Sequence, residues 1–490
     1  MTGISLSSPA RVRPPSAEVS IRRRLRNSPA VLVIIKESTL HAASEEAAVP
    51  SKSIISVAEF IHSSCAGSTR ASIKSDSAKV LDCRVKPGND DKLRMTRRAC
   101  AGLLALGVAL FAPAASAIDP IKIGATVAQS PPGASAQQVR DGLEVAAKII
   151  NDGGGVLGRP FALVFVDTTP DNAAAAVEKL ATQDKVAAIV GEHNSASALA
   201  ALEVAHRYKI PYVTAARSHV IAEKLYPEIY SPGISNIQIA AAIAEAMKSL
   251  GAKRVVAFTE NSDPGIELAN LLAQQLNKQE TGIQYTFEQL DPAAKDFSAV
   301  LQPHKSNPPD AIVQMLRPPA AYALLNQLQG MAPTSKTWLY DASALIEDPA
   351  FWQNVKDARG MLVFGQYHPK MPLPDLGKKV ADAYKAKTGK EPNSTLLQTA
   401  DSLLMVAEAI RSGGSSEPEA ITKALESLKW TGTRGKIAFS AEKDEFKYHQ
   451  WLDVPYVTFQ ITAAKQPIGE TLLVQDPGQP LDASRLQRTQ

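Results

Sequence analysis

Cysteine is nearly absent from this chain of 490 residues, and its three cysteines, Cys65, Cys83 and Cys100, all lie before residue 118. The rest of the sequence therefore cannot form a disulfide framework, a thiolate zinc site or a cysteine nucleophile. Long apolar runs are lacking as well, because the stretch 101–112 is too short to span a bilayer as a stable helix. With 45% hydrophobic and 21% charged residues, the chain can bury a substantial core, and its length predicts two or three domains.

Excess positive charge is also missing from most of the chain. Of the 53 Lys and Arg residues 17 precede residue 118, as do 9 of the 49 Asp and Glu residues, so 118–490 holds 36 basic and 40 acidic residues. This part has a net charge of −4, and its basic residues are dispersed, without interleaved aromatic residues. We therefore expect no nucleic-acid partner.

Residues 95–117 have the three parts of a secretory signal peptide. Arg97 and Arg98 give a charged start, 101–112 is a short apolar stretch, and the sequence ends in the small-residue motif Ala-Ser-Ala at 115–117. A buried core helix is the alternative, but it would not explain that motif. Cys100 precedes the apolar stretch, so it is not placed to carry a lipid anchor. We expect a soluble exported protein that is not a lipoprotein.

The 94 residues before this segment are unusual, because a signal peptide normally begins a chain. Residues 1–94 are rich in Ser and Arg and lack sustained hydrophobic periodicity, which predicts disorder. Our hypothesis is that they are a wrongly assigned upstream extension and that Met95 is the true start.

From residue 118 the sequence alternates short β-rich runs with amphipathic helical stretches, which is typical of a parallel α/β sheet. In the first expected helix, four apolar residues share one face: Leu143, Ala146, Ala147 and Ile150. A first series of strands is expected at 121–127, 161–166, 186–190 and 210–214. After residue 250 the pattern restarts, with strands at 254–259, 283–289, 311–316, 337–340 and 360–364. Two doubly wound lobes account for the length.

The motifs that would indicate a cofactor, a metal site or catalysis are either absent or in the wrong structural position. Residues 153–158 match G-x-G-x-x-G, but they follow an expected helix and lead into a strand, whereas a phosphate-binding loop opens a helix. A helix C-cap and turn fits better. The histidines are isolated, without metal-site spacing, and no nucleophile motif or short-spaced carboxylate pair is present. We expect no enzyme, no cofactor and no metal; a hydrolase of small amides is kept as an alternative that lacks a visible nucleophile.

Ligands of doubly wound sheets bind at the loops that follow the carboxyl ends of the strands. Hydroxyl groups and free amides at helix N-termini there favour a carboxylate, and an acidic side chain opposite would bind an ammonium group. This combination suits an amino acid. The loops in question are 129–135, 167–171, 191–197 and 214–219, and then 260–265, 317–319 and 341–343.

A series of motifs resembles the leucine/isoleucine/valine-binding protein family of ABC importers, and it covers nearly all of 118–490. The motifs lie, in order, at 121–124, 140–147, 150–159, 185–191, 210–214, 295–298, 310–313 and 434–439. The resemblance implies a type I periplasmic binding protein fold, in which two Rossmann-like lobes joined by a three-strand hinge close on a ligand. With crossings near 231–235, 370 and 440–446, the N-terminal lobe is 118–233 plus 372–440. The C-terminal lobe is 234–371 plus 441–490.

The resemblance also assigns ligand-binding residues in the first lobe. Ser195 falls where the family has a hydroxyl that binds the ligand carboxylate, with Asn194 beside it in the same loop, and Ser218 falls at a second such hydroxyl. Arg217 stands where the family usually has a small residue.

Three further residues are assigned in the second lobe. Asp263 lies beside Pro264, where the family often has a tyrosine, and Arg317 lies near another aromatic position. Asp341 falls near the acidic residue that meets the ligand ammonium, with a helix cap as its alternative role. Arg217 and Arg317 are alternatively solvated or paired across the lobes; if both face the cleft, they suit a ligand with an extra carboxylate or another anionic group.

The family resemblance implies a periplasmic solute-binding protein that captures an amino acid or related small carboxylate and delivers it to an ABC permease with its ATPase subunits. We expect a monomer. The alternative is a periplasmic sensory receptor that uses the same two-lobe closure to signal through a partner.

Overall fold

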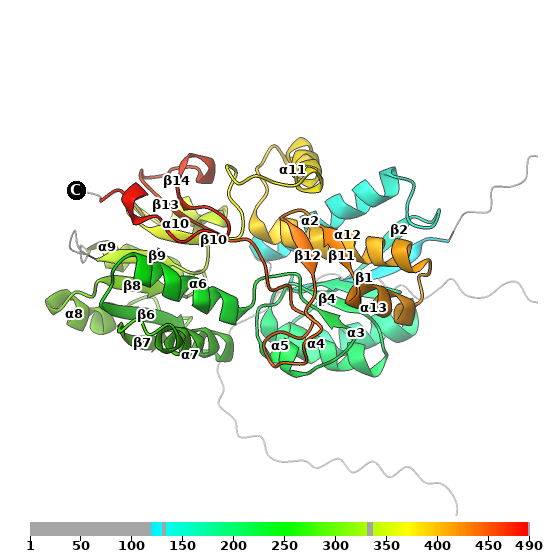
Figure 1. Ribbon diagram of the computed structural model, residues 1–490, viewed down its shortest axis with the longest axis horizontal. Helices are drawn as coiled ribbons and strands as arrows, with labels where there is room; N and C mark the ends of the chain where they lie inside the picture. The colour runs from blue at the N-terminus through cyan, green and yellow to red at the C-terminus, as the bar shows by residue number, and fades with distance from the viewer. Residues whose placement is uncertain (1–118, 130–133, 331–336, 489–490) are drawn as a thin grey trace, which may run out of the picture. The chain divides into compact units, whose positions relative to one another are not determined.

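The computed structural model describes residues 119–129, 134–330 and 337–488, all within the compact unit Ala101–Gln490. They form two α/β lobes side by side (Figure 1). The expected upstream extension 1–94, the expected signal peptide 95–117 and the three cysteines lie outside the described residues. Among the described residues, no helix is both long and apolar enough to cross a membrane.

The first lobe is built on a five-stranded parallel sheet in the order β2-β1-β3-β4-β5. The central strands are apolar and buried on both faces, because helices cover the sheet on both sides. The strands are β1 (Ile121–Val127), β2 (Phe161–Asp167), β3 (Ala188–Gly191), β4 (Tyr212–Thr214) and β5 (Ile229–Tyr230).

Helices from two distant parts of the chain cover this sheet. Four come from the strand connections: α2 (Ala134–Asp152), α3 (Ala173–Lys179), α4 (Ser195–Arg207) and α5 (Val220–Glu223). Three return from beyond the second lobe: α11 (Asp375–Thr388), α12 (Ser394–Gly413) and α13 (Pro418–Glu426). The β11 (Lys429–Thr431) and β12 (Lys436–Ala438) pair follows them.

The contact between α2 and α12 depends on Gly142. A Cβ atom at this position would lie 2.2 Å from Oγ1 of Thr399 and 2.5 Å from the backbone oxygen of Leu396. The absence of a side chain therefore lets the two helices approach each other closely.

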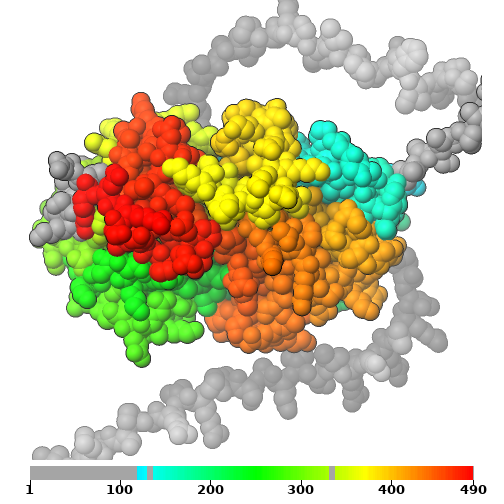
Figure 2. Space-filling view, turned by 45° about the horizontal axis from the view of Figure 1, so that its top comes forward, coloured from blue at the N-terminus to red at the C-terminus, as the bar shows by residue number. Residues whose placement is uncertain are grey.

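The second lobe has a seven-stranded sheet in the order β14-β13-β10-β9-β8-β6-β7. The strands from β10 to β7 in this order pair in parallel. At the other edge, β13 pairs antiparallel with β10 and with β14. The strands are β6 (Arg254–Glu260), β7 (Gln284–Leu290), β8 (Ala311–Gln314), β9 (Trp338–Asp341), β10 (Leu362–Gly365), β13 (Val457–Gln460) and β14 (Leu472–Gln475). The C-terminal segment (red) lies against green segments of the second lobe, and the orange part of the chain lies beside the cyan start of the first lobe (Figure 2).

The helices of this lobe include α6 (Asn236–Ser249), α7 (Asp263–Lys278), α8 (Ser298–Ser306), α9 (Ala320–Gly330) and α10 (Phe351–Asn354). The short 3-10 helix η3 (Leu345–Glu347) follows β9. As expected, the second series of strands starts after residue 250, with β6, and α7 packs on α6, which precedes that strand. The alanine-rich sequence of α6 is buried on most sides and so shows little amphipathic contrast.

The expected fold class of two doubly wound lobes is confirmed. The four apolar residues assigned to one face of α2 are all buried. The glycine-rich segment after α2 is a turn, with Gly154, Gly155 and Gly158 at positive φ, and it leads into β2. The turn interpretation of this segment is therefore right, and no nucleotide loop is formed there.

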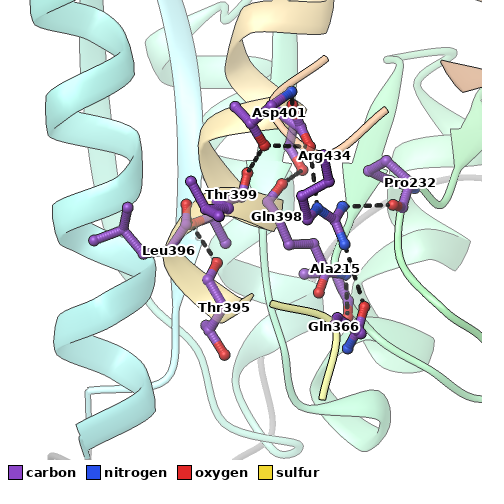
Figure 3. A network of polar contacts seen from close by, with 12 residues as sticks. Ala215, Pro232, Gln366, Thr395, Leu396, Gln398, Thr399, Asp401 and Arg434 are labelled. Carbon is purple, nitrogen blue, oxygen red and sulfur yellow. Dashed lines mark hydrogen bonds and ion pairs between the residues drawn. The ribbon is translucent and has the colours of Figure 1, made fainter. Parts of the chain in front are cut away.

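The chain passes between the lobes three times, after β5, after β10 and after β12, and the guanidinium of Arg434 binds residues of the first two crossings. It donates hydrogen bonds to the backbone oxygen of Pro232 (3.0 Å) and to Oε1 of Gln366 (3.3 Å). Its Nε atom pairs with Oδ2 of Asp401 on α12 at 3.3 Å, and both side chains are fully buried (Figure 3). Asp401 also accepts from the backbone N–H (2.6 Å) and hydroxyl (2.8 Å) of Thr433. The charges are thus held in a satisfied network at the hinge.

Candidate functional site

A cavity of about 380 Å³ lies between the two lobes, where the strands of both sheets end. The loops after β1, β3 and β4 line it from the first lobe, and the loops after β6, β8 and β9 line it from the second. This is the position at which open α/β sheets bind ligands. A wider hollow of about 860 Å³ lies along α6, away from the strand ends, and lacks this relation to the sheets.

The N-terminus of α4 points its first residues at the cavity. Asn194 caps the helix, because its side-chain oxygen accepts from the backbone N–H groups of Ala196 (2.9 Å) and Ser197 (3.1 Å). The hydroxyl oxygen of Ser195 accepts from the backbone N–H of Arg217 (3.3 Å), so its own hydrogen stays available to a ligand. A helix N-terminus with a free hydroxyl is a favourable place for a carboxylate.

Arg217 places an unpaired cation in the same wall. Within the part of the chain that the structure describes, its guanidinium has no hydrogen bond and no ion pair, and its Nε atom is buried. Burial, and then the nearby charge of Arg317, lower the pKa of Arg217 to about 10, so the group stays positively charged at neutral pH. A half-buried charge without a direct partner favours the binding of an anion at this point.

His193, in the loop between β3 and α4, also lines the cavity and is neutral. Burial, with the charges of Arg217 and Arg317, lowers its pKa to about 3. Its Nε2 atom is buried and without a hydrogen-bond partner. The ring therefore contributes hydrogen bonding to the cavity and no charge.

From the second lobe, Arg317 and Glu347 complete the polar lining. The backbone N–H of Arg317 donates to Oε1 of Glu260 (2.7 Å), while its exposed guanidinium makes no hydrogen bond or ion pair with the described residues. Glu347 lies at the end of η3, and its Oε2 atom accepts from the backbone N–H of Ser394 (3.1 Å) and from the hydroxyl of that serine. Ser394 begins α12, so this contact joins the two lobes. The Oε1 atom of Glu347 is buried without a partner, and burial raises the pKa of the carboxyl group.

Of the seven residues expected at the site, the structure brings four to the cavity lining: Asn194, Ser195, Arg217 and Arg317. Ser218, Asp263 and Asp341 lie outside the lining. The hydroxyl of Ser218 donates to Glu267 on α7 (2.7 Å), and Asp263 is an exposed residue in the first turn of α7.

Asp341 is fully buried beneath the cavity. Its Oδ1 atom accepts from the backbone N–H of Ser343 (2.9 Å) and from the side chain of Gln314 (3.1 Å), and its Oδ2 atom accepts from the backbone N–H of Leu345 (2.7 Å). Burial raises the pKa of Asp341 to about 7. Both oxygens are occupied by the turn after β9, which positions η3. Glu347, six residues later, does line the cavity, as do Glu260 and Asp348 of the same lobe, and no sequence motif distinguishes Asp341 from Glu347.

The comparisons with known proteins agree with this arrangement. The model of the periplasmic binding protein family matches residues 120–464. An amino acid binding protein of Pseudomonas aeruginosa is 26% identical over 372 residues, which are 72% of this chain and 96% of that protein. A Leu/Ile/Val-binding protein of Rhizobium johnstonii, BraC3, is 26% identical over 374 residues, which are 73% of this chain and 98% of that protein.

Solved structures share the two-lobe fold. The leucine binding protein LivK of Thermotoga maritima has a TM-score of 0.63 at 25% identity, over 75% of this chain and all of that one. A solute binding protein of an ABC transporter from Rhodopseudomonas palustris, solved with benzoate, has a TM-score of 0.61 at 16% identity, over 74% of this chain and 97% of that one. The expected resemblance is thus confirmed, and the family consists of periplasmic binding proteins, which are not enzymes. The chain belongs to the periplasmic binding protein family, with the Leu/Ile/Val-binding proteins among its relatives.

Proposed function

We propose that this protein is the solute-binding component of an ABC importer and captures an amino acid or related small carboxylate between its lobes. The observation that carries the proposal is the unpaired guanidinium of Arg217, which lies in the cavity wall beside Ser195 and the N-terminus of α4. A carboxylate at this point would meet a cation, a hydroxyl and a helix dipole together.

The names of the relatives favour import over sensing. Those reported above are named as amino acid, Leu/Ile/Val or ABC transporter solute binding proteins. The proposed partners are therefore a small-molecule ligand and the permease and ATPase subunits of an importer. The protein would act as a monomer without cofactor, with the lobes 118–233 plus 372–440 and 234–371 plus 441–490.

Export by residues 95–117 and a start at Met95 belong to the same proposal. Mass spectrometry of the protein purified from its own host tests both. A mature N-terminus near Ile118 is expected, and any peptide from residues 1–94 would contradict the proposed start.

The binding function is tested by thermal unfolding. The protein is produced from the full chain, exported with its own leader, and freed of bound ligand by reversible denaturation. A panel of amino acids and organic acids is added singly. A true ligand at about 100 times its Kd stabilises the folded protein by about 2.7 kcal/mol, which raises the melting temperature by several degrees. Native mass spectrometry before stripping identifies any ligand that copurifies. A panel and a native spectrum that both show no ligand would contradict the binding function.

Transport is tested separately in cells. Deletion of the gene is expected to reduce uptake of the identified ligand, and the intact gene to restore it. Unchanged uptake together with loss of a transcriptional response to the ligand would instead favour the sensing alternative.

A further inference from the structure

The cavity holds three charged side chains that lack full partners, and they come from both lobes. Arg217 faces it from the first lobe, and Arg317 and Glu347 face it from the second. The two guanidinium groups make no hydrogen bond or ion pair with any described residue, and Glu347 has one buried oxygen, Oε1, without a donor.

The other titratable groups of the lining are Glu192, His193, Glu260 and Asp348, and none of them pairs with either guanidinium group. Asp348 accepts from the backbone N–H of Ala350 (2.8 Å). Both oxygens of the Glu192 carboxylate are occupied, by the hydroxyl of Thr168 and by the backbone N–H of Asn194 (2.7 Å). Glu260 accepts from the backbone of Arg317 and leaves the guanidinium of that residue free. His193 is neutral, as its lowered pKa shows. Arg217 and Glu347 attract each other without a direct contact, and Arg317 is exposed, so direct partners for the three charged groups are left to a ligand.

A branched-chain amino acid would satisfy this cavity only in part. Its single carboxylate can neutralise one guanidinium, and its apolar side chain would leave the other beside a desolvated ligand without a counter-charge. A buried polar group that a ligand fails to pair is the main source of discrimination between otherwise similar ligands.

On the basis of the proposed binding function, we infer that the ligand is an acidic amino acid. One carboxylate pairs with Arg217 beside Ser195, the second carboxylate pairs with Arg317, and the ammonium group donates to Oε1 of Glu347. Each charge of the ligand then meets one unpaired charge of the cavity. Arginine suits this role, because its planar donors bind a carboxylate with two parallel hydrogen bonds.

The contact between Glu347 and Ser394 links ligand binding to closure of the two lobes. Glu347 belongs to the second lobe and Ser394 to the first, so the residue assigned to the ammonium group also holds the lobes together. A ligand that reaches Glu347 from the first-lobe side therefore favours the closed state, since it binds that state better than the open one.

The test compares four probes of nearly equal length by titration calorimetry: L-glutamate, L-glutamine, glutarate and L-leucine. Glutamine differs from glutamate only in the second anionic group, and glutarate lacks only the ammonium group. L-Aspartate is added to allow for a shorter ligand. The wild-type protein is expected to bind glutamate or aspartate at least about tenfold more tightly than any of the other three probes.

Two variants test which cavity residue binds each group of the ligand, and a third variant is the control. R317Q is expected to make glutamate and glutamine bind about equally, and E347Q to remove the preference for glutamate over glutarate. R207Q is the matched control, because Arg207 is an exposed arginine at the far end of α4, outside the cavity lining. Unchanged melting temperatures of the ligand-free variants show that folding is retained.

Equal binding of glutamate and glutamine by the wild-type protein would overturn the inference. Binding of another carboxylate from the panel, with no binding of glutamate or aspartate, would overturn it as well while leaving the proposed function in place. Failure of every panel compound would count against the proposed function itself.

Discussion

The hydroxyl of Ser218, in the first lobe, donates a hydrogen bond of 2.7 Å to Oε2 of Glu267, on α7 of the second lobe. Nδ1 of His219 lies 2.9 Å from Oε1 of the same carboxylate, and Nδ2 of Asn236 donates to that oxygen at 2.9 Å. Ser218 and His219 belong to the first lobe, whereas Asn236 and Glu267 belong to the second, so opening of the cleft would separate Glu267 from Ser218 and His219. Glu267 therefore stabilises the closed state at one side of the cleft, as Glu347 does at the cavity.

The ion pair between His219 and Glu267 predicts that ligand affinity depends on pH. The carboxylate of Glu267 raises the pKa of His219, and the nearby charges of Glu223 and Glu445 act in the same direction, while the ring of Phe446 packs beside it. In the open state the histidine would return toward its ordinary pKa of 6.5. Closure thus favours the protonated ring, and its contribution is complete below 6.5 and is lost as the pH rises through the raised pKa.

At the acidic end, hydrogen bonds from His219, Ser218 and Asn236 outweigh burial and lower the pKa of Glu267 from its ordinary 4.5. Its contribution is therefore lost only as the pH falls below that value. We expect ligand affinity, measured by calorimetry, to be several-fold higher near about pH 6 than near about pH 8.5. H219Q should flatten this dependence, whereas H304Q, a histidine change on α8, should not. An affinity that rises toward high pH in the wild-type protein would contradict the closure role of His219.

The buried pair of Arg434 and Asp401 predicts a large stability effect at the hinge. R434M removes one partner and leaves Asp401 charged and buried, which typically costs about 3–5 kcal/mol. It also removes the hydrogen bonds to Pro232 and Gln366, so the first two crossings lose a shared contact. Denaturant unfolding followed by circular dichroism measures the free energy of unfolding.

The control for this change is R411Q, because Arg411 forms an exposed ion pair with Glu408 on the same helix as Asp401. Exposed pairs contribute little, so a change within about 0.5 kcal/mol is expected. Equal effects of R434M and R411Q would show that the hinge network does not stabilise the fold.

The close approach of α2 to α12 leaves no room for a side chain at position 142, so we expect a substitution of Gly142 to destabilise the protein. In G142A the new methyl group would overlap the backbone oxygen of Leu396, which cannot rotate away as a side chain can. Overpacking of this kind costs about 1–3 kcal/mol, so the melting temperature is expected to fall by several degrees. G469A is the control, because its methyl group would meet only ordinary contacts with Pro369 at 3.7 Å. A melting temperature of G142A equal to that of G469A would contradict the proposed constraint.

Most strands of the first lobe can be predicted from the sequence, because each is defined by an apolar run and flanking turns within a short stretch of the chain. The expected strand at 121–127 coincides with β1, since an apolar run of β-branched residues between turns defines it without reference to the rest of the chain. The strand at 186–190 is shifted by two residues at its start, to Ala188, because the π-helix η2 (Leu180–Asp184) and Lys185 in the left-handed region extend the preceding turn.

The site is predicted less well, because it depends on contacts between lobes. Ser218 and Arg217 are adjacent in sequence, yet Arg217 lines the cavity while the hydroxyl of Ser218 reaches Glu267, 49 residues away. Asp341 and Glu347 are both acidic residues after β9, and the direction of each is set by the turn between them. A pattern along one strand or helix contains no information about such partners.

Ser195 gives the most direct test of the carboxylate subsite. Its hydroxyl lies in the cavity wall, whereas the hydroxyl of Ser197, two residues later on α4, is buried and outside the lining. S195A removes a donor that would bind a charged carboxylate, so the Kd of the identified ligand is expected to rise roughly tenfold. S197A removes a hydroxyl of the same kind from the same helix and is expected to change the Kd by less than about twofold, because that hydroxyl has no partner to lose. Calorimetry with both variants separates direct ligand contact from a general effect on α4. If S195A and S197A weaken binding equally, the ligand carboxylate is not held at the N-terminus of α4.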